Sequence, residues 1–256
     1  MSPFGVRLQF HGGLAFFLKS DHTKGVLDRR LNEKSSVKDV IESCGVPHPE
    51  VDLILVDGVP VDFVETIESD VQIDVYPVER CPTLFAEKRL QIRNIKRFIA
   101  DGHLGKLVRD LRLLGFDVLY DRDAEDRQLL KQLRTEPDRA LLTRDRPLLM
   151  HAVVRHGYYL RSQDPLEQTV EIMKRFELPR GFNPFTRCLR CNGPLEQVEK
   201  GAVVDRLEPL TKIYYEEFRR CSACGQIYWP GSHFSKLRKR IDAIEARYSE
   251  DNRHLS

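Results

Sequence analysis

Four cysteines and a set of aspartates are the residues of this 256-residue chain whose types and spacing could do chemistry. The cysteines form two Cys-x-x-Cys pairs, Cys188 with Cys191 and Cys221 with Cys224, separated by 29 residues. Each such turn presents two thiolates to one ion, and two turns complete a tetrahedral Cys₄ site for zinc. Because the protein supplies all four ligands, no position is left open for water, and we expect a structural Zn²⁺.

The aspartates lie between residues 97 and 145, where short apolar runs end in acidic residues. The run at 98–99 precedes Asp101, and the run Ala140–Thr143 precedes Asp145. A third run, Phe116–Tyr120, leads into an acidic cluster. This cluster contains Asp121, Asp123, Glu125 and Asp126.

Helical periodicity separates these apolar runs. Residues 102–114 carry leucines and a valine at helical spacing before Gly115, and a second apolar helix face follows Asp126. Strands that alternate with helices of this length predict an α/β fold with a parallel sheet flanked by helices. Sites in such sheets form at the carboxyl ends of the strands, where the acidic residues lie.

Carboxylates that converge on one edge of a sheet repel each other unless a cation neutralises them. Hard oxygen ligands without cysteine or histidine suit Mg²⁺ or Mn²⁺, so the acids predict a divalent metal site. The alternative is that each aspartate is a helix N-cap, a position that favours this residue type.

Length and charge suggest more than one module and a polyanionic partner. A chain of 256 residues is long enough for about two domains and a small third module. Residues 1–80 carry a formal charge of −6 and the remaining residues +8, so an acidic head precedes a basic body. No run reaches the roughly 18 apolar residues of a membrane span and MSPFGVRLQF does not read as a signal peptide, so we expect a cytoplasmic protein without membrane contact.

Residues 1–80 read as a separate β-grasp domain. An alternating strand from Val6 to Phe10 and the apolar residues Ala15–Leu18 predict an opening hairpin; a short helix after Ser36 and three later strands follow. The stretches LILVDGVPVDF and VQIDVYPV resemble ubiquitin-like sulfur carriers of the ThiS and MoaD type. Those carriers end in a free Gly-Gly, which this chain replaces with a continuing strand. We therefore expect a docking module for a protein partner.

The body is predicted to contain two further modules. Residues 92–180 form the α/β domain, and residues 186–236 form the Cys₄ zinc ribbon with a basic helix at 236–250. Within the ribbon, Ala202–Val204 and Ile213–Phe218 are expected as strands.

Aromatic and basic residues gather after the second cysteine pair. The rings of Tyr228, Trp229 and His233 stand next to Lys236 and Arg238, a combination that suits stacking and phosphate contacts with single-stranded RNA. The alternative is that the rings pack against the ribbon, whose own core is small. Both interpretations stay open at this point.

The ordered combination of motifs is similar to a known family. The stretches FIADGHLGKLVRDLRLLGFDVLYDRDAEDRQLL, ALLTRD and CGQIYWPGSHF, together with the Cys-x-x-Cys pairs, resemble the Mut-seven-type C-terminal RNase domain. That family is a PIN-like nuclease branch with a zinc ribbon, often preceded by a ubiquitin-like module. The resemblance implies a PIN-like fold and metal-dependent cleavage of RNA, in single strands or exposed loops.

The resemblance also assigns roles to residues. It implies that Asp101, Asp126 and Asp145 hold the catalytic Mg²⁺ or Mn²⁺, with Asp123 as the alternative second acid and Asp121 near enough to be an additional or substitute ligand. Lys106 and Arg144 are expected to contact the RNA phosphate. Hydrolysis would proceed by attack of a metal-activated water at phosphorus. Two alternatives are an RNA-binding protein that does not cut and a scaffold whose acidic head recruits a partner.

Overall fold

The computed structural model describes residues 2–19, 25–178 and 183–253. Residues 1 and 20–24 of the expected head, and residues 179–180 at the end of the expected α/β domain, lie outside the described residues. The chain divides into two compact units. The first unit is Met1–Arg93 with Asp126–Tyr159, and the second is Asn94–Glu125 with Leu160–Ser256.

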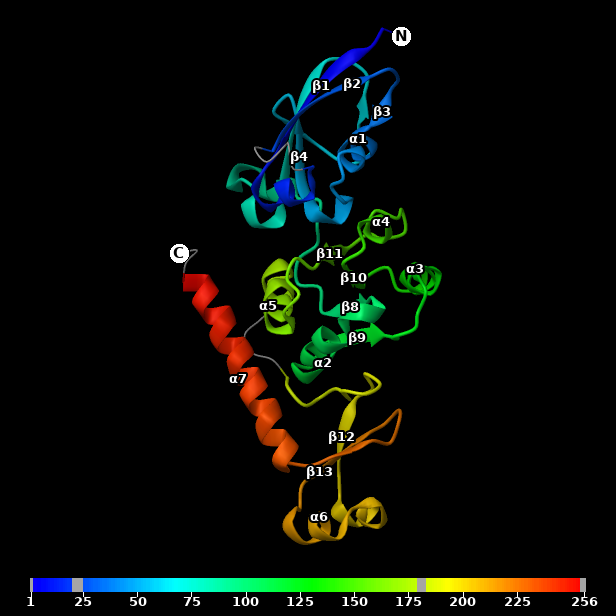
Figure 1. Ribbon diagram of the computed structural model, residues 1–256, viewed down its shortest axis with the longest axis vertical. Helices are drawn as coiled ribbons and strands as arrows, with labels where there is room; N and C mark the ends of the chain where they lie inside the picture. The colour runs from blue at the N-terminus through cyan, green and yellow to red at the C-terminus, as the bar shows by residue number, and fades with distance from the viewer. Residues whose placement is uncertain (1, 20–24, 179–182, 254–256) are drawn as a thin grey trace. The chain divides into compact units, whose positions relative to one another are not determined.

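The head of the first unit contains a five-stranded sheet in the order β2-β1-β7-β4-β5 (Figure 1). β1 and β7 pair in parallel and the other neighbours are antiparallel. Alternate residues of β1 are buried, as expected of a strand with one face on a core. The strands are β1 (Phe4–Phe10), β2 (Val26–Leu31), β4 (Val51–Val56), β5 (Val59–Val61) and β7 (Val71–Pro77).

Helix α1 (Val37–Ser43) covers the core of this sheet. It begins where the Ser36 side chain accepts a hydrogen bond from the backbone N–H of Asp39, and its buried residues join the apolar cluster of the sheet. Short elements complete the head and confirm the expected β-grasp arrangement. They are the pair β3 (Ser35–Ser36) and β6 (Thr66–Ile67) and the 3₁₀ helices η3 (His48–Glu50), η4 (Val78–Arg80) and η5 (Thr83–Lys88).

The prediction that Ala15–Leu18 forms the second strand of an opening hairpin is wrong. Gly12–Phe17 forms the 3₁₀ helix η1, and the antiparallel partner of β1 is β2. Gly12 has a φ of 55°, which bends the chain out of the extended conformation. Leu14 and Phe17 are both buried, and their spacing of three residues matches the 3₁₀ period and not strand alternation.

A second sheet contains four strands in the order β11-β10-β8-β9. The pairs β10–β11 and β8–β9 are parallel, which confirms the α/β expectation. The expected strand Ala140–Thr143 is β10 with the same bounds, and all four of its residues are buried. The other strands are β8 (Arg97–Ala100), β9 (Asp117–Tyr120) and β11 (Gly157–Tyr159).

Helices connect these strands, as the periodicity predicts. In the first unit, α3 (Asp126–Thr135) precedes β10, and α4 (Arg146–Leu149) follows it. In the second unit, the 3₁₀ helix η6 (Gly102–Leu104) leads into α2 (Gly105–Leu113), which packs against β9 and α5 (Pro165–Arg175). Asp164 caps α5 by accepting hydrogen bonds from the N–H groups of Leu166 and Glu167.

The ribbon of the second unit has three antiparallel strands in the order β12-β13-β14. They are β12 (Leu195–Val198), β13 (Phe218–Cys221) and β14 (Ile227–Tyr228). The prediction of strands at Ala202–Val204 and Ile213–Phe218, between the cysteine pairs, is wrong. The 3₁₀ helices η7 (Lys200–Ala202) and η8 (Val204–Arg206) replace the first. In place of the second, Ile213 and Tyr214 end α6 (Pro209–Tyr214), which has proline in its first turn, residues 215–217 are irregular, and Phe218 begins β13.

The C-terminal helix α7 (Ser232–Arg253) packs against α2 and α5. Its buried Ile241, Ile244 and Tyr248 supply the apolar contact. Asp110 of α2, 6% exposed, pairs with Arg240 through three N–O contacts of 2.5 to 3.1 Å. The basic helix is thus partly a structural element. None of the described helices is long and apolar enough to span a membrane.

Candidate metal sites

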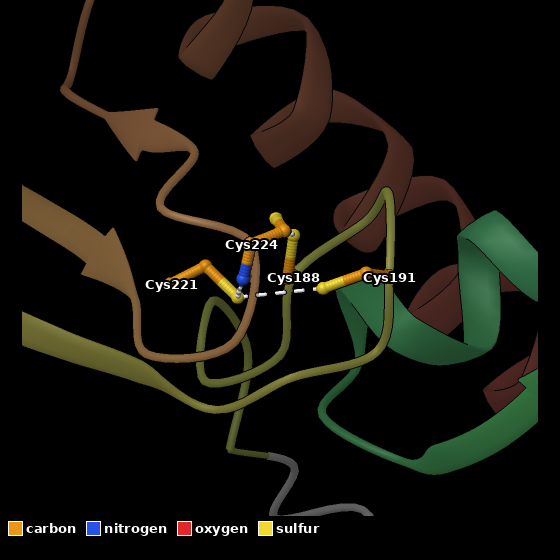
Figure 2. A group of neighbouring side chains, drawn as sticks. All are labelled: Cys188, Cys191, Cys221 and Cys224. Carbon is orange, nitrogen blue, oxygen red and sulfur yellow. Dashed lines mark hydrogen bonds between the residues drawn. The ribbon is translucent and has the colours of Figure 1, made fainter.

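The four cysteines of the ribbon lie together (Figure 2). All four Sγ atoms are within 4.8 Å of one another, with Cys188 3.7 Å from Cys224 and Cys191 3.4 Å from Cys221. Zinc–sulfur bonds of about 2.3 Å in a tetrahedron separate the sulfur atoms by about 3.8 Å. The predicted cluster therefore exists, and its donor set and spacing fit one zinc ion.

Local backbone geometry shapes the two cysteine turns. Asn192 and Gly225 follow the pairs with φ angles of 70° and 71°, values that favour asparagine and glycine. A Cβ on Gly193 would lie 2.8 Å from the Sγ of Cys221, so a side chain there would displace a ligand. Gly193 thus keeps space for the sulfur atoms.

Tyr228 supports the thiolate of Cys188. Its hydroxyl oxygen lies 3.1 Å from Cys188 Sγ and accepts a hydrogen bond of 3.1 Å from the N–H of Leu189. Burial raises the pKa of the Cys188 thiol, but hydrogen bonds from Tyr228 and from the backbone of Cys191 and Arg190 outweigh it and lower the pKa to about 7. Zinc binds the thiolate form, so these bonds favour binding.

Two polar side chains join the first cysteine turn to strand β9. The Asn192 Oδ1 accepts a hydrogen bond of 3.0 Å from Val118 N–H, and its Nδ2 donates to Asp117 Oδ1 at 2.8 Å. Arg112 of α2, 4% exposed, donates to the Val118 carbonyl at 2.8 and 3.1 Å and to the Arg190 carbonyl at 3.1 Å. Sequence reasoning missed both residues.

Asp101 directly follows β8. It occupies the N-cap position of η6, yet its side chain makes no capping hydrogen bond. The register of β8 with β9 pairs Ala100 with Tyr120, so Asp101 and Asp121 follow neighbouring strand ends of one sheet. The N-cap alternative therefore fails for Asp101.

The loop that contains Asp121 and Asp123 lies against the start of η6. A Cβ on Gly102 would lie 2.4 Å from the carbonyl oxygen of Arg122, so only glycine allows this approach. The Tyr120 hydroxyl also donates to the Gly102 carbonyl at 2.8 Å. Asp121 Oδ1 accepts from Asp123 N–H at 3.1 Å, and both side chains are exposed.

The remaining two acids belong to the first unit. Asp126 is exposed at the first position of α3. Asp145 is exposed and is the N-cap of α4: its Oδ1 accepts a hydrogen bond of 2.8 Å from Leu148 N–H. Its own N–H donates to Thr143 Oγ1 at 2.9 Å. The N-cap alternative thus holds for Asp145, although a cap requires only one carboxylate oxygen.

The residues predicted to contact RNA have different surroundings. Lys106 is exposed on α2, and Arg144 is half-buried after β10. Trp229 is 36% exposed, and His233 and Lys236 are exposed at the start of α7.

The other aromatic residues of this region pack against neighbouring side chains. The rings of Phe185 and Phe234 stack at 4.5 Å, and the Arg238 guanidinium lies 5.5 and 5.8 Å from their centroids. The Tyr228 hydroxyl, as described, faces the cysteine cluster. The region therefore contains both packed and exposed aromatic rings. The exposed rings fit the stacking of RNA bases, and the packed rings fit the alternative of packing against the ribbon.

The fold and the sites define the class of protein. A parallel α/β sheet with acids after its strands, a four-cysteine ribbon and a β-grasp head together define an α/β protein with a candidate structural zinc site.

Family models agree with this class. The Mut7-C RNAse domain matches residues 96–241, and the Mut7-C ubiquitin domain matches residues 4–82. The first match covers more than half of the chain, so the protein belongs to the Mut7-C RNAse domain family. Among curated proteins, none matches this sequence significantly.

Proposed function

We propose that the protein is a metal-dependent ribonuclease that hydrolyses RNA phosphodiester bonds. The observation that carries the proposal is the position of the acids. Asp101, Asp121 and Asp145 each lie within two residues of the end of a strand. β8 and β9 pair in parallel in the second unit, and β10 pairs in parallel with β11 in the first. Ligand sites of parallel sheets form at this edge.

Asp101, Asp126 and Asp145 would hold Mg²⁺ or Mn²⁺, with Asp123 as the alternative to Asp126. Carboxylate oxygens are the donors that these ions prefer. When bound, the metal lowers the pKa of a water molecule and offsets charge on the phosphate.

The chain's own residues supply the rest. Asp101 would contribute a carboxylate directly after β8, and the cap bond of Asp145 fixes one oxygen and so orients the other. Lys106 and Arg144 would bind the RNA phosphate as cations.

The ribbon would add RNA affinity and hold the structural zinc. Trp229 offers an exposed ring for stacking, and the exposed Lys236, seven residues later in the chain, offers a cation for phosphate. The ubiquitin-like head, which has no candidate metal ligand, is proposed as a docking module for a protein partner.

A protein that binds RNA without cutting it is the second candidate. The observation that favours it is the capping role of Asp145, which a purely structural aspartate would also have. The two candidates differ in what the charge of this residue does, so a substitution that keeps the cap and removes the charge separates them.

The test is Asp145→Asn, assayed with labelled single-stranded and hairpin RNA at increasing Mn²⁺ concentrations. Asparagine keeps a carbonyl oxygen for the cap, so folding stability should fall by at most about 1 kcal/mol. Loss of a ligand charge removes several kcal/mol of transition-state stabilisation, and cleavage should fall by at least about a hundredfold while RNA binding persists.

Asp138→Asn is the matched control. Asp138 is exposed and precedes β10, whereas Asp145 follows the same strand at its other end. The control should cleave RNA at the wild-type rate. A folded Asp145→Asn protein with wild-type cleavage would refute the proposed site, and RNA binding without metal-dependent cleavage by the wild type would favour the second candidate.

A further inference from the structure

The residue that follows Asp145 is held by the ubiquitin-like head (residues 4–82). The Arg146 guanidinium donates hydrogen bonds to the carbonyl oxygens of Phe17, at 2.9 Å, and Phe16, at 3.5 Å. Both acceptors are in η1, the segment that sequence analysis expected as a strand. Gly45 keeps this place open, because a Cβ there would lie 3.0 Å from the Phe17 oxygen.

Three aromatic rings surround the same guanidinium. Its Cζ lies 5.6 Å from the ring centroid of Phe16, 5.1 Å from Phe17 and 5.8 Å from Tyr159. The ring faces attract a cation at these distances. Two of the rings come from the head and the third from β11, so Arg146 is bound by both parts of the first unit.

A second set of polar contacts fixes β11 to the head. Glu50, 3% exposed, accepts a hydrogen bond of 2.7 Å from Tyr159 N–H. A ring nitrogen of His48 lies 2.6 Å from the Val154 carbonyl oxygen. Buried polar contacts of this kind specify one arrangement, because breaking them leaves unpaired polar groups.

These contacts lead to Asp145 by two routes. Arg146 is the first residue of α4, whose N-cap is Asp145. Tyr159 pairs with Thr143 across β10 and β11, and the Thr143 hydroxyl oxygen accepts from Asp145 N–H. A displacement of the head would therefore move the backbone on both sides of this acid.

We infer that the ubiquitin-like head positions the Asp145 carboxylate through Arg146, and so sets the metal affinity of the site. The inference rests on the proposed function, and it makes Arg146 a positioning residue that itself contacts neither metal nor RNA. Outer contacts that orient a metal ligand typically change metal affinity by about 10- to 100-fold when removed.

The test compares four full-length variants. Arg146→Ala removes the cation, and Arg146→Lys keeps the charge but not the paired donors. Phe16→Ala removes a ring that is 48% exposed and so leaves no core cavity. Arg155→Ala is the matched control: it removes an exposed arginine of the segment between α4 and β11 for which the described residues provide no contact.

Two readouts do not depend on catalysis. Mn²⁺ binding, followed by electron paramagnetic resonance without RNA, should weaken about tenfold in Arg146→Ala, less in Phe16→Ala and Arg146→Lys, and not in the control. Hydrogen exchange should quicken at Leu148 and Leu149 in the same order, since the Leu148 N–H is bonded to Asp145.

The outcomes separate this inference from the proposed function. Unchanged exchange at Leu148 in Arg146→Ala, or faster exchange with wild-type Mn²⁺ affinity, would overturn the positioning role. A wild-type protein that binds Mn²⁺ but cuts no RNA would overturn only the proposed function. A wild-type protein that binds no Mn²⁺ would overturn both.

Discussion

The side chain of Asn192 connects the cysteine cluster to the nuclease sheet, and replacing it should loosen strand β9. Its amide accepts from Val118 N–H and donates to Asp117, while its backbone has a φ of 70°. Asn192→Ala removes both side-chain bonds and places alanine in the left-handed region. Asn192→Gly removes the same bonds without that conformational cost.

The expected loss of opening free energy in β9 follows from the unpaired or strained backbone groups that each variant leaves. Val118 is fully buried, and loss of the hydrogen-bond partner of a buried N–H costs about 1–3 kcal/mol. Alanine at positive φ adds about 1 kcal/mol. We expect the opening free energy of β9 to fall by about 2 kcal/mol in Asn192→Gly and by about 3 kcal/mol in Asn192→Ala.

Hydrogen exchange measured by NMR at Val118, Leu119 and Tyr120 checks this prediction. A loss of about 2 kcal/mol corresponds to exchange about 30 times faster. Zinc content is measured on the same samples, so that loss of the ion is not mistaken for loss of the side chain. Wild-type exchange rates in a zinc-loaded Asn192→Gly protein would refute the reasoning.

Two further predictions concern a close backbone approach and the zinc ion. Gly102→Ala should lower stability by about 1–3 kcal/mol and reduce cleavage, because the new Cβ would lie 2.4 Å from the Arg122 carbonyl oxygen. Gly201→Ala, with nothing within 4 Å in the described structure, is the matched control, and equal melting temperatures of the two variants would contradict the prediction. Chelation of zinc should unfold the ribbon and quicken hydrogen exchange in β9, while the core of the head stays protected from exchange. Limited proteolysis and hydrogen exchange of the zinc-free protein test this prediction. A ribbon that stays folded after zinc loss would contradict it.

Elements with a strong local signal were predictable from the sequence. β10 is a continuous buried run, and its predicted bounds are those observed. The cysteine cluster was predictable because a Cys-x-x-Cys turn specifies its own geometry. The identity of the acidic residues that follow the strands was also predictable, because the change from strand to helix periodicity marks where each strand ends.

The errors came from short apolar segments. Ala15–Leu18 was expected as a strand, but a four-residue apolar run does not distinguish alternation from a 3₁₀ period. Ile213–Phe218 contains the end of α6 and the start of β13, and Pro209 at the first turn of α6 was the helix signal that could have corrected it. Ile213 and Tyr214 are 68% and 72% exposed, so the apolar side chains at these positions were a misleading indication of a buried strand.

Single polar residues that make tertiary contacts were the least predictable. Nothing in the sequence singles out Arg112, Asn192 or Arg146 as a contact residue, because a lone polar residue carries no periodicity. Their roles come from carbonyl oxygens and amides that are 6 to 130 residues away in the chain. The φ of 70° at Asn192 is a partial exception, because asparagine before glycine is a common signal for such a backbone.

These three residues share a placement that has a functional consequence. In the first unit, the head is bonded to the residue after Asp145. In the second unit, the ribbon is bonded to β9, the strand that precedes Asp121. Each flanking module thus contacts an element that borders a candidate acid, although neither module supplies one. Damage to the head or to the zinc cluster should therefore reach the acids through the strands that carry them, and the effect should appear in metal affinity before it appears in global unfolding.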